Sequence, residues 1–424
     1  MLLIKNGRMT NNGDETTDLL IKDGKIVPPD ELPDDRQALT VIDARGCILA
    51  PGLVDMHVHF RDPGFLYKED LISGSDAAAA GGVTTVACMP NTSPVIDSAE
   101  AVADSISRAI KAPINILTYA AVTLGQKNQA LTDAAVLKAS GAVALSDDGM
   151  PVMNAALLRA AMNAAKKLDM LIISHCEDAD LVKNYAVNEG IISEKLGIPG
   201  RPAVAEELMV MRDVILARET GARLHIAHVS TAGSVEIIRR AKAAGVLVSA
   251  ETCPQYFTLT ENEVLLQGAL AKVNPPLRTS KDVEAIIRGL TDGTIDAIAT
   301  DHAPHSADEK SLSLEKAPSG MVGLETSLSL ALTMLYHTGK LPLGRIIELM
   351  SANPSKILGI NKGQISIGSD ADLVIFDPDE AWTVDPKKFR SKGRNTPFSG
   401  MTLRGKVKYT IARGKIVFSA QGTV

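Results

Sequence analysis

Two histidines two residues apart, His57 and His59, are the first residues in the chain whose spacing could support chemistry. They end an apolar run, residues 53–60, that predicts a β-strand. Alternate residues of a strand share a face, so both imidazoles can point to one spot. Two convergent imidazoles predict a metal site, and two satisfied core histidines are the alternative interpretation.

Five of the other six histidines lie at or just beyond the ends of further apolar runs. His175 ends one run, His225 and His228 lie in the next, and His302 and His305 follow the last. Because His225 and His228 are three apart, a strand should turn them to opposite sides, and only one can face a barrel interior. We predict His228, nearer the end of its run, as the ligand and His225 as structural.

Three carboxylates follow apolar runs in the same way. Asp301 ends one run, and a carboxylate there is costly to bury unless it is paired or binds a metal. Asp147 and Asp148 end another run, and one of them could bridge two metals, but spacing alone does not choose between them. Imidazoles and carboxylates together suit zinc, with one or two ions per chain and two favoured.

Such a centre would make hydroxide near neutral pH and polarise a carbonyl group. Asp301 could then take the proton of the nucleophile and hand it to a leaving nitrogen. The residue types therefore predict a metal-dependent amide hydrolase.

The elements that must position these residues alternate along the middle of the chain. Short apolar runs are separated by Ala-rich helical patterns, which predicts repeated βα units. The runs are residues 53–60, 83–89, 114–121, 142–146, 171–175, 222–230, 246–251 and 295–300. Eight units predict an α/β fold, a (β/α)8 TIM-like barrel, and a doubly wound open sheet is the alternative. The sequence has no GxGxxG or GxxxxGK[ST] phosphate loop.

Both ends of the chain contain short apolar runs that predict strands. Asn6-Gly7 and Asp23-Gly24 are two-residue hairpin signals, and Arg413-Gly414 predicts a turn. We expect a small β-sandwich domain built from both termini, residues 1–52 plus 360–424. The barrel is then expected over residues 53–359.

Composition limits the other function classes. The 424 residues carry a net charge of −6, and no basic stripe or apolar span predicts nucleic-acid or membrane binding. The first residues lack the pattern of a signal peptide. The four cysteines lie far apart without a CxxC pair, which predicts reduced thiols and a cytoplasmic protein.

The motifs around these residues resemble those of the cyclic amidohydrolases, and more narrowly those of dihydroorotases of the longer, bacterial class I type. The resemblance covers nearly the whole chain. Its motifs are residues 51–64, 89–92, 146–149, 173–178, 225–230, 251–256, 272–278, 300–305 and 323–326.

The resemblance implies zinc-dependent, reversible closure of N-carbamoyl-L-aspartate to dihydroorotate, the third step of pyrimidine synthesis. It implies that His57, His59 and Asp301 hold one zinc ion, and that His175 and His228 hold a second. Asp148 matches the carboxylate that bridges the two ions, and Asp301 also matches the catalytic proton carrier.

Arg61 lies two residues beyond His59 on the same side of the chain. A planar guanidinium there can bind a substrate carboxylate through two hydrogen bonds. The substrate-binding residues that the resemblance implies are His59, Arg61, Asn91, Asn274, His305, Ser319 and Gly320.

Two other functions fit part of this pattern. Hydantoinases and many allantoinases typically bridge their metals with a carboxylated lysine from the fourth strand, but that run has no lysine here, and Lys138 precedes it. An inactive relative that serves as a structural partner of aspartate transcarbamoylase would have lost metal-site histidines, and here all matching positions are filled. We expect a homodimer, and association with aspartate transcarbamoylase is compatible with an active enzyme.

Overall fold

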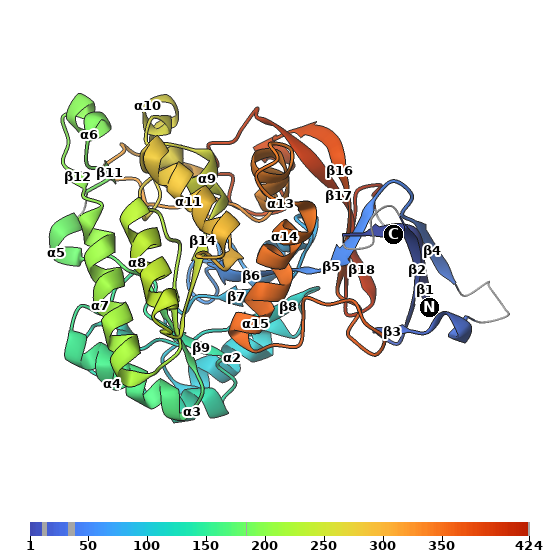
Figure 1. The fold of residues 1–424 in the computed structure, drawn as a ribbon, viewed down its shortest axis with the longest axis horizontal. Helices are drawn as coiled ribbons and strands as arrows, with labels where there is room; N and C mark the ends of the chain where they lie inside the picture. Colours follow the sequence, from blue (N-terminus) through green and yellow to red (C-terminus); the bar gives the residue numbers. More distant parts are fainter. Residues whose placement is uncertain (11–14, 33–38, 184, 423–424) are drawn as a thin grey trace.

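The computed structural model describes residues 1–10, 15–32, 39–183 and 185–422. Figure 1 shows two parts, a barrel surrounded by helices and a sheet that contains both ends of the chain. In the described part of the chain, no helix has the length and apolar character needed to cross a membrane.

The barrel consists of eight parallel strands, one for each predicted run. They are β6 (Leu53–Val58), β7 (Val83–Cys88), β8 (Asn115–Thr118), β9 (Ala144–Ser146), β10 (Leu171–Ser174), β13 (Leu224–Ile226), β14 (Val248–Thr252) and β15 (Ala297–Ile298). They form a three-stranded sheet, β6-β7-β8, and a five-stranded sheet, β9-β10-β13-β14-β15. Two isolated parallel bridges, Ala120 with Leu145 and Val58 with His302, join these sheets into a closed ring. The predicted barrel is therefore confirmed.

Helices follow the strands and cover the outside of the barrel (Figure 1). The longer or strand-covering ones are α1 (Leu71–Ala80), α2 (Ala99–Ala109), α3 (Ala134–Ala139), α4 (Ala155–Lys167), α7 (Val204–Thr220), α8 (Ala232–Ala243), α11 (Ser280–Asp292) and α13 (Ser327–Ala331). Shorter segments are α5 (Ala179–Val182), α6 (Ile191–Leu196), α9 (Pro254–Thr258), α10 (Glu263–Gln267), α12 (Ala307–Lys310), α14 (Leu343–Ile347), α15 (Asn353–Leu358), and the π-helical turns η4 (Leu332–Tyr336) and η5 (Glu348–Ala352). A two-stranded sheet, β11 (Val187–Asn188) with β12 (Gly200–Arg201), lies beside α6.

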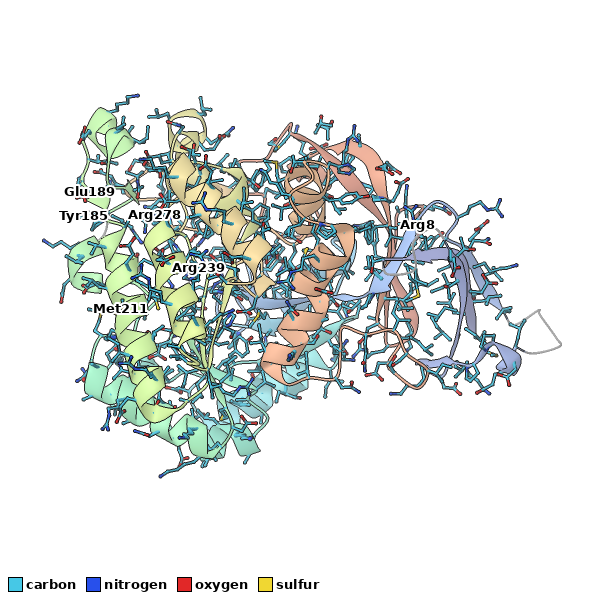
Figure 2. The ribbon with its side chains drawn as sticks, viewed as in Figure 1. Arg8, Tyr185, Glu189, Met211, Arg239 and Arg278 are labelled. Carbon is cyan, nitrogen blue, oxygen red and sulfur yellow. The ribbon has the colours of Figure 1, made fainter. Side chains whose placement is uncertain are left out.

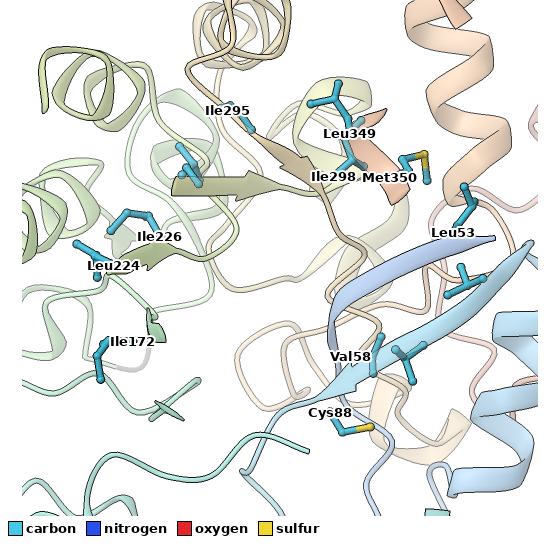
Figure 3. Close-up of a cluster of buried hydrophobic side chains, with 14 of the residues drawn as sticks. Leu53, Val58, Cys88, Ile172, Leu224, Ile226, Ile295, Ile298, Leu349 and Met350 are labelled. Carbon is cyan, nitrogen blue, oxygen red and sulfur yellow. The ribbon is translucent and has the colours of Figure 1, made fainter. Parts of the chain in front are cut away.

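Most strands of the barrel bury both of their faces, and β8 is only partly buried. Leu224 and Ile226 of β13 belong to the outer cluster between strands and helices, together with Ile172 of β10 (Figure 3). Ile173 belongs to a separate, inner cluster. Each such aliphatic side chain contributes about 1.5–3 kcal/mol by leaving water, so this alternation fixes which residues face inward. His225, between Leu224 and Ile226, therefore faces the barrel interior.

The terminal strands form one eight-stranded sheet that makes up the β-sandwich domain. Its order is β18-β17-β16-β5-β1-β2-β3, with β4 also on β1. The strands are β1 (Leu2–Met9), β2 (Thr16–Lys22), β3 (Lys25–Val27), β4 (Thr40–Asp43), β5 (Ile48–Pro51), β16 (Leu373–Thr383), β17 (Thr402–Ala412) and β18 (Lys415–Ser419). The domain boundaries given above stay a prediction.

Two of the three predicted turns are confirmed. Asp23-Gly24 connects β2 to β3, and Arg413-Gly414 connects β17 to β18, all with positive φ. The hairpin predicted at Asn6-Gly7 is wrong, because β1 runs straight through it with an irregular register between Ile4 and Gly7. Asn6 takes φ 59° inside the strand, and its side chain donates to Asp43 Oδ1 at 2.9 Å.

Candidate metal centre

His57 and His59 meet two carboxylates at the carboxyl end of the barrel. His59 Nε2 lies 3.0 Å from Asp301 Oδ1 and 3.4 Å from Asp148 Oδ2. His57 Nε2 lies 3.6 Å from the same Asp301 atom and 3.4 Å from Asp148 Oδ1. All four side chains are buried. The carboxyl ends of β6, β9 and β15 thus bring His57 and His59 together with Asp148 and Asp301, which are distant from them in sequence.

His175 and His228 approach the same Asp148 from the other side. Their nitrogens, Nδ1 and Nε2, are 2.7 Å apart, and each lies 3.5 Å from Asp148 Oδ1. Two ring nitrogens this close need a proton or a cation between their lone pairs. Asp148 Oδ2 thus faces His59, while Oδ1 faces His57, His175 and His228, so this carboxylate lies among all four imidazoles, where it could bridge two ions.

Asp147 and Asp148 have separate surroundings. Asp147 accepts hydrogen bonds from the backbone N–H groups of Val122 and Thr123, at 2.8 and 3.2 Å, and from the Thr123 hydroxyl. It shapes the loop after β8, while Asp148 faces the histidines. The geometry therefore favours Asp148 as the bridging residue, the same choice that the resemblance implied.

The donor atoms fit a metal ion. In the described part of the chain, His57 Nε2 and Asp148 Oδ1 are buried without a hydrogen-bond partner, which is costly unless a cation satisfies them. Among the described residues, two groups have ligand atoms close enough to share an ion, His57-Asp148-His228 and His57-His59-Asp301. Nitrogen and carboxylate donors in this arrangement suit Zn²⁺.

The electrostatic field of the centre also favours a cation. Burial lowers the pKa of His57, but Asp148 and Glu251 outweigh burial and raise this pKa well above its ordinary value. Burial raises the pKa of Asp148, but the imidazoles of His57, His175 and His228 together hold it well below its ordinary value. A field that retains protons on imidazoles would equally stabilise a divalent ion in their place.

A second layer orients the two histidines of β6. His57 Nδ1 lies 2.6 Å from Glu251 Oε1, and His59 Nδ1 lies 2.9 Å from Asn91 Oδ1. An Nδ1–H that donates to these oxygens leaves the Nε2 lone pair free for a metal. Sequence reasoning missed Glu251 in this role, although it ends an apolar run just as Asp301 does.

His225 lies beneath this layer. Its Nε2 is 3.2 Å from Glu251 Oε2, and its Nδ1 is 2.8 Å from Ser249 Oγ. The prediction that only one of His225 and His228 faces the interior is wrong. The strand β13 ends at Ile226, and His228 has φ 34°, so strict alternation no longer applies at His228.

A further group surrounds His175, of which the sequence predicted Asn274 but not Glu177 or Arg201. Asn274 Nδ2 lies 3.3 Å from His175 Nε2 and donates to Glu177 Oε2 at 3.1 Å. Arg201 Nη1 lies 2.8 Å from Glu177 Oε1. Burial raises the pKa of Glu177, but His175 and Arg201 outweigh it and lower this pKa to about 2. Glu177 is therefore an anion that holds His175 and Asn274 in place.

Arg201 is itself fixed by the short sheet beyond the barrel. Its Nε donates to the carbonyl of Tyr185 at 2.5 Å, and Arg278 Nη1 donates to the Arg201 carbonyl at 3.0 Å. Figure 2 shows Tyr185 and Arg278 at the end of the molecule formed by α6, β11 and β12.

A cavity of about 200 Å³ opens beside the metal-facing atoms. Every residue predicted to bind substrate lines it, and so do all the predicted metal ligands except the deeper His57. Its lining consists of His59, Arg61, Asn91, Asp148, Gly149, His175, His228, Asn274, Asp301, Ala303, His305, Ser319 and Gly320. A larger hollow of about 550 Å³ lies against Trp382 and β17, and none of the predicted site residues lines it.

Arg61 brings a positive charge to this cavity without a direct carboxylate contact in the described part of the chain. Within the described ranges, no carboxylate oxygen lies within 4.0 Å of its guanidinium, whose Nη2 is 3.4 Å from His305 Nε2. Burial is the main influence on the pKa of Arg61 and lowers it. Arg61 (φ 59°), His228 (φ 34°) and Asp301 (φ 49°) all take the left-handed backbone region, where strain in non-glycine residues is typical of functional sites.

Gly320 brings its loop close to the other wall of the cavity. Its φ is 132°, and an added Cβ would lie 2.7 Å from Ala303 Cβ and 3.2 Å from His305 Nε2. His305 Nε2 lies 2.9 Å from the carbonyl oxygen of Ser319. Any larger residue at position 320 would push these segments apart.

Comparisons with known proteins agree with this geometry. A model of the amidohydrolase family matches residues 48–417. The dihydroorotase of Pelotomaculum thermopropionicum is 50% identical to this chain over 98% of both proteins. The dihydroorotase of Ruminiclostridium cellulolyticum is 51% identical over 97% of both. A solved L-hydantoinase (dihydropyrimidinase) from Arthrobacter aurescens is 28% identical, with a TM-score of 0.88 over 100% of this chain and 97% of that one.

The family match covers most of the chain, and the two dihydroorotases match it almost from end to end. A (β/α)8 barrel with a β-sandwich domain and buried His and Asp residues at the barrel mouth agree with both findings. The chain belongs to the amidohydrolase family, and within it to the dihydroorotases.

Proposed function

We propose that this chain reversibly closes N-carbamoyl-L-aspartate to dihydroorotate, with release of water, in pyrimidine synthesis. Identity of about 50% to dihydroorotases over nearly the full chain supports this reaction. The observation that carries the substrate class is Arg61, whose half-buried guanidinium lines the same cavity as the candidate metal ligands and has no carboxylate oxygen within 4.0 Å among the described residues. A ring that carries a carboxylate would supply its missing partner.

We propose Zn²⁺ as the metal, with one or two ions per chain and two favoured. His57, His59 and Asp301 would hold one ion, His175 and His228 the other, and Asp148 would bridge them. Two atoms without hydrogen-bond partners, His57 Nε2 and Asp148 Oδ1, support a cation at this centre. A bound zinc ion supplies an acidified water molecule and polarises the carbonyl group that is attacked.

Asp301 is proposed as the catalytic proton carrier. Its contacts to His57 and His59 are both made by Oδ1, which leaves Oδ2 for a proton. In ring opening, Asp301 would accept the proton of the nucleophile and deliver it to the ring nitrogen that leaves. In ring closure the same carboxyl group would move the proton the opposite way.

The remaining cavity residues would bind the substrate. Arg61 would hold the carboxylate, while Asn91, Asn274 and His305 present polar side chains around the ring. The backbone groups of Ser319 and Gly320 complete this wall. A substrate held on several sides keeps its reacting carbonyl aligned with the metal centre.

A ring opener of the hydantoinase type is the competing function, favoured by the similarity to the solved hydantoinase. The strand β9 argues against it, because Asp147 and Asp148 follow β9 and no lysine occurs there. Lys138 lies in α3, and its Nζ donates to the carbonyl of Leu168, away from the cavity. Arg61 also favours an anionic substrate over hydantoin.

The test is turnover of dihydroorotate, hydantoin and allantoin by the purified protein, with zinc per chain measured by elemental analysis on the same sample. We expect turnover of dihydroorotate far above the other two, and one to two zinc ions per chain. Faster opening of hydantoin or allantoin, or no turnover of dihydroorotate by the zinc-loaded protein, would contradict the proposal.

We further propose a homodimer that can associate with aspartate transcarbamoylase. An apolar stripe on the outer side of α7 supports an interface, since its residues recur at helical spacing and remain exposed. They are Val204 (43% exposed), Leu208 (51%), Met211 (44%) and Ile215 (46%), and Figure 2 shows Met211 on this side. Light scattering of Met211→Glu should give a monomer if a second copy covers the stripe, and an unchanged dimer would place the interface elsewhere.

A cytoplasmic location is proposed as well. All four cysteines are free in the structure, and Cys88, Cys176 and Cys253 are buried. Reduced, buried thiols are typical of proteins from a reducing compartment. Fractionation of the native cells, followed by detection of the chain, tests this point.

A further inference from the structure

A segment from the C-terminal part of the chain, residues 390–395, packs against two loops that line the substrate cavity. It ends in Asn395, which is only 3% exposed. Its Nδ2 donates to the carbonyl oxygens of Ala303 and Gly320, each at 3.1 Å, and its Oδ1 accepts from the backbone N–H of His305 at 3.0 Å. The carboxamide therefore uses both donors and its acceptor on the backbone of two loops.

These two loops form one wall of the substrate cavity. The first, residues 302–305, follows β15 and contains His305. The second, residues 319–322, contains Ser319 and Gly320, and its Val322 N–H donates to the Asn395 carbonyl at 2.9 Å. Asn395 thus bridges both loops through four hydrogen bonds, and an apolar side chain at this position could make none of the three that its carboxamide makes.

The segment is held firmly enough to act as a support. Glu325 Oε1 accepts from the backbone N–H groups of Arg390 and Ser391, at 2.8 and 3.1 Å. Glu69 Oε1 accepts from the Lys392 N–H at 3.2 Å. An added Cβ on Gly393 would lie 2.7 Å from Pro304 Cβ, so a glycine allows the close approach.

We propose that Asn395 is a positioning residue for substrate binding. It acts through His305 and the Ser319-Gly320 backbone, and it does not touch the metal-binding atoms. This inference rests on the proposed function, because those residues are the proposed substrate contacts. Through Asn395, the C-terminal segment supplies part of the precision of the site, beyond its contribution to the sheet.

The test compares Asn395→Ala and Asn395→Ser with Asn353→Ala. Asn353 is the matched control, because its Nδ2 also donates to a backbone carbonyl, that of Asp296, at 2.8 Å, before the start of β15. We expect KM for dihydroorotate to rise about tenfold in Asn395→Ala, with kcat changed less than about threefold and zinc content unchanged. Asn395→Ser keeps one donor, so its KM should lie between that of the wild-type protein and that of Asn395→Ala. Asn353→Ala should lower the melting temperature without changing KM.

Hydrogen exchange provides a readout that does not depend on turnover. The His305 N–H loses its acceptor in Asn395→Ala, so exchange should quicken in peptides that cover residues 301–306 and 318–323, and not in Asn353→Ala. Wild-type exchange in both peptides, or an equal rise in KM in the control, would overturn the inference. Failure of the wild-type protein to turn over dihydroorotate would instead reject the proposed function, while exchange still decides whether Asn395 holds the two loops.

Discussion

His57 and His175 each have one ring nitrogen that points away from Asp148, and these two nitrogens have different surroundings. His57 Nδ1 binds Glu251, which lies deep in the barrel, and neither residue lines the substrate cavity. His175 Nε2 lies beside Asn274, which does line the cavity, and beside Glu177. We refer to His57 with Glu251 as the deep side, and to His175 with Asn274 and Glu177 as the cavity side.

The difference separates two tasks. Residues of the deep side can tune a metal ion without contacting substrate, because they lie behind it. On the cavity side, His175 and Asn274 both line the cavity and Asn274 contacts the candidate ligand His175, so metal binding and substrate binding should be coupled there. Substitutions on each side can test this division.

The largest expected effect is that of His57→Ala on the deep side. His57 belongs to both groups of candidate ligands, so its loss should remove metal from the whole centre and lower kcat/KM by about 1,000-fold or more. Elemental analysis and turnover of dihydroorotate measure both changes. His337→Ala is the matched control, since His337 Nε2 contacts the Pro378 carbonyl far from the site. A fully metallated, active His57→Ala protein would refute the ligand role.

Arg61→Ala should have the next largest effect and leave both sides of the centre intact. Loss of a half-buried charge that hydrogen-bonds the substrate carboxylate should raise KM for dihydroorotate about 100-fold, while zinc content stays at the wild-type level. Arg61→Lys keeps the charge without the planar fork and should fall between. Collapse of metal content in Arg61→Ala would show that Arg61 is structural instead.

Glu251→Gln tests whether the deep side acts on the metal alone. A neutral amide makes the His57 ring a weaker base, so zinc affinity should fall about 30-fold, with KM of the zinc-saturated enzyme unchanged. Titration with a competing chelator measures the affinity. Glu261→Gln is a matched control, since Glu261 is also buried and accepts from Asn188 away from the centre. A large change in KM for Glu251→Gln would break the proposed division.

Asn274→Ala tests the coupling expected on the cavity side. It should raise KM about tenfold and also weaken zinc binding, because its carboxamide contacts Glu177 and His175. Both quantities should change together, in contrast with Glu251→Gln. If only KM changes, then Asn274 binds substrate without supporting the metal, and the two sides are more alike than the contacts suggest.

Sequence patterns were sufficient for the barrel and for the main cluster of its site. All eight apolar runs are strands, because a strand buried on both faces needs a continuous apolar stretch. Parallel strands end at one rim, so residues that follow them, such as His175 and Asp301, meet there. Periodicity and position carry this information directly.

The remaining features depend on geometry that local patterns do not encode. β13 is only three residues long, so strand alternation gives the direction of the His225 side chain but not that of His228, which lies beyond the strand. Asn6-Gly7 offers the chemistry of a tight turn, but pairing along β1 uses it as an irregularity within a strand. Glu177 and Arg201 meet across 24 residues, and only the folded chain brings them together.

The closure of the barrel has a consequence for how the molecule opens. Its two sheets are joined by single bridges, and one of these lies between Val58 and His302. Val58 is adjacent in sequence to His59, and His302 is adjacent to Asp301. His59 and Asp301, 242 residues apart, meet at that seam. An ion bound there would link the first strand to the last and close a very long loop. This would stabilise the folded state, because the ion binds only there. Metal release and separation of the first and last barrel strands would then occur in one kinetic step, and the metal-bound enzyme would unfold more slowly than the metal-free protein.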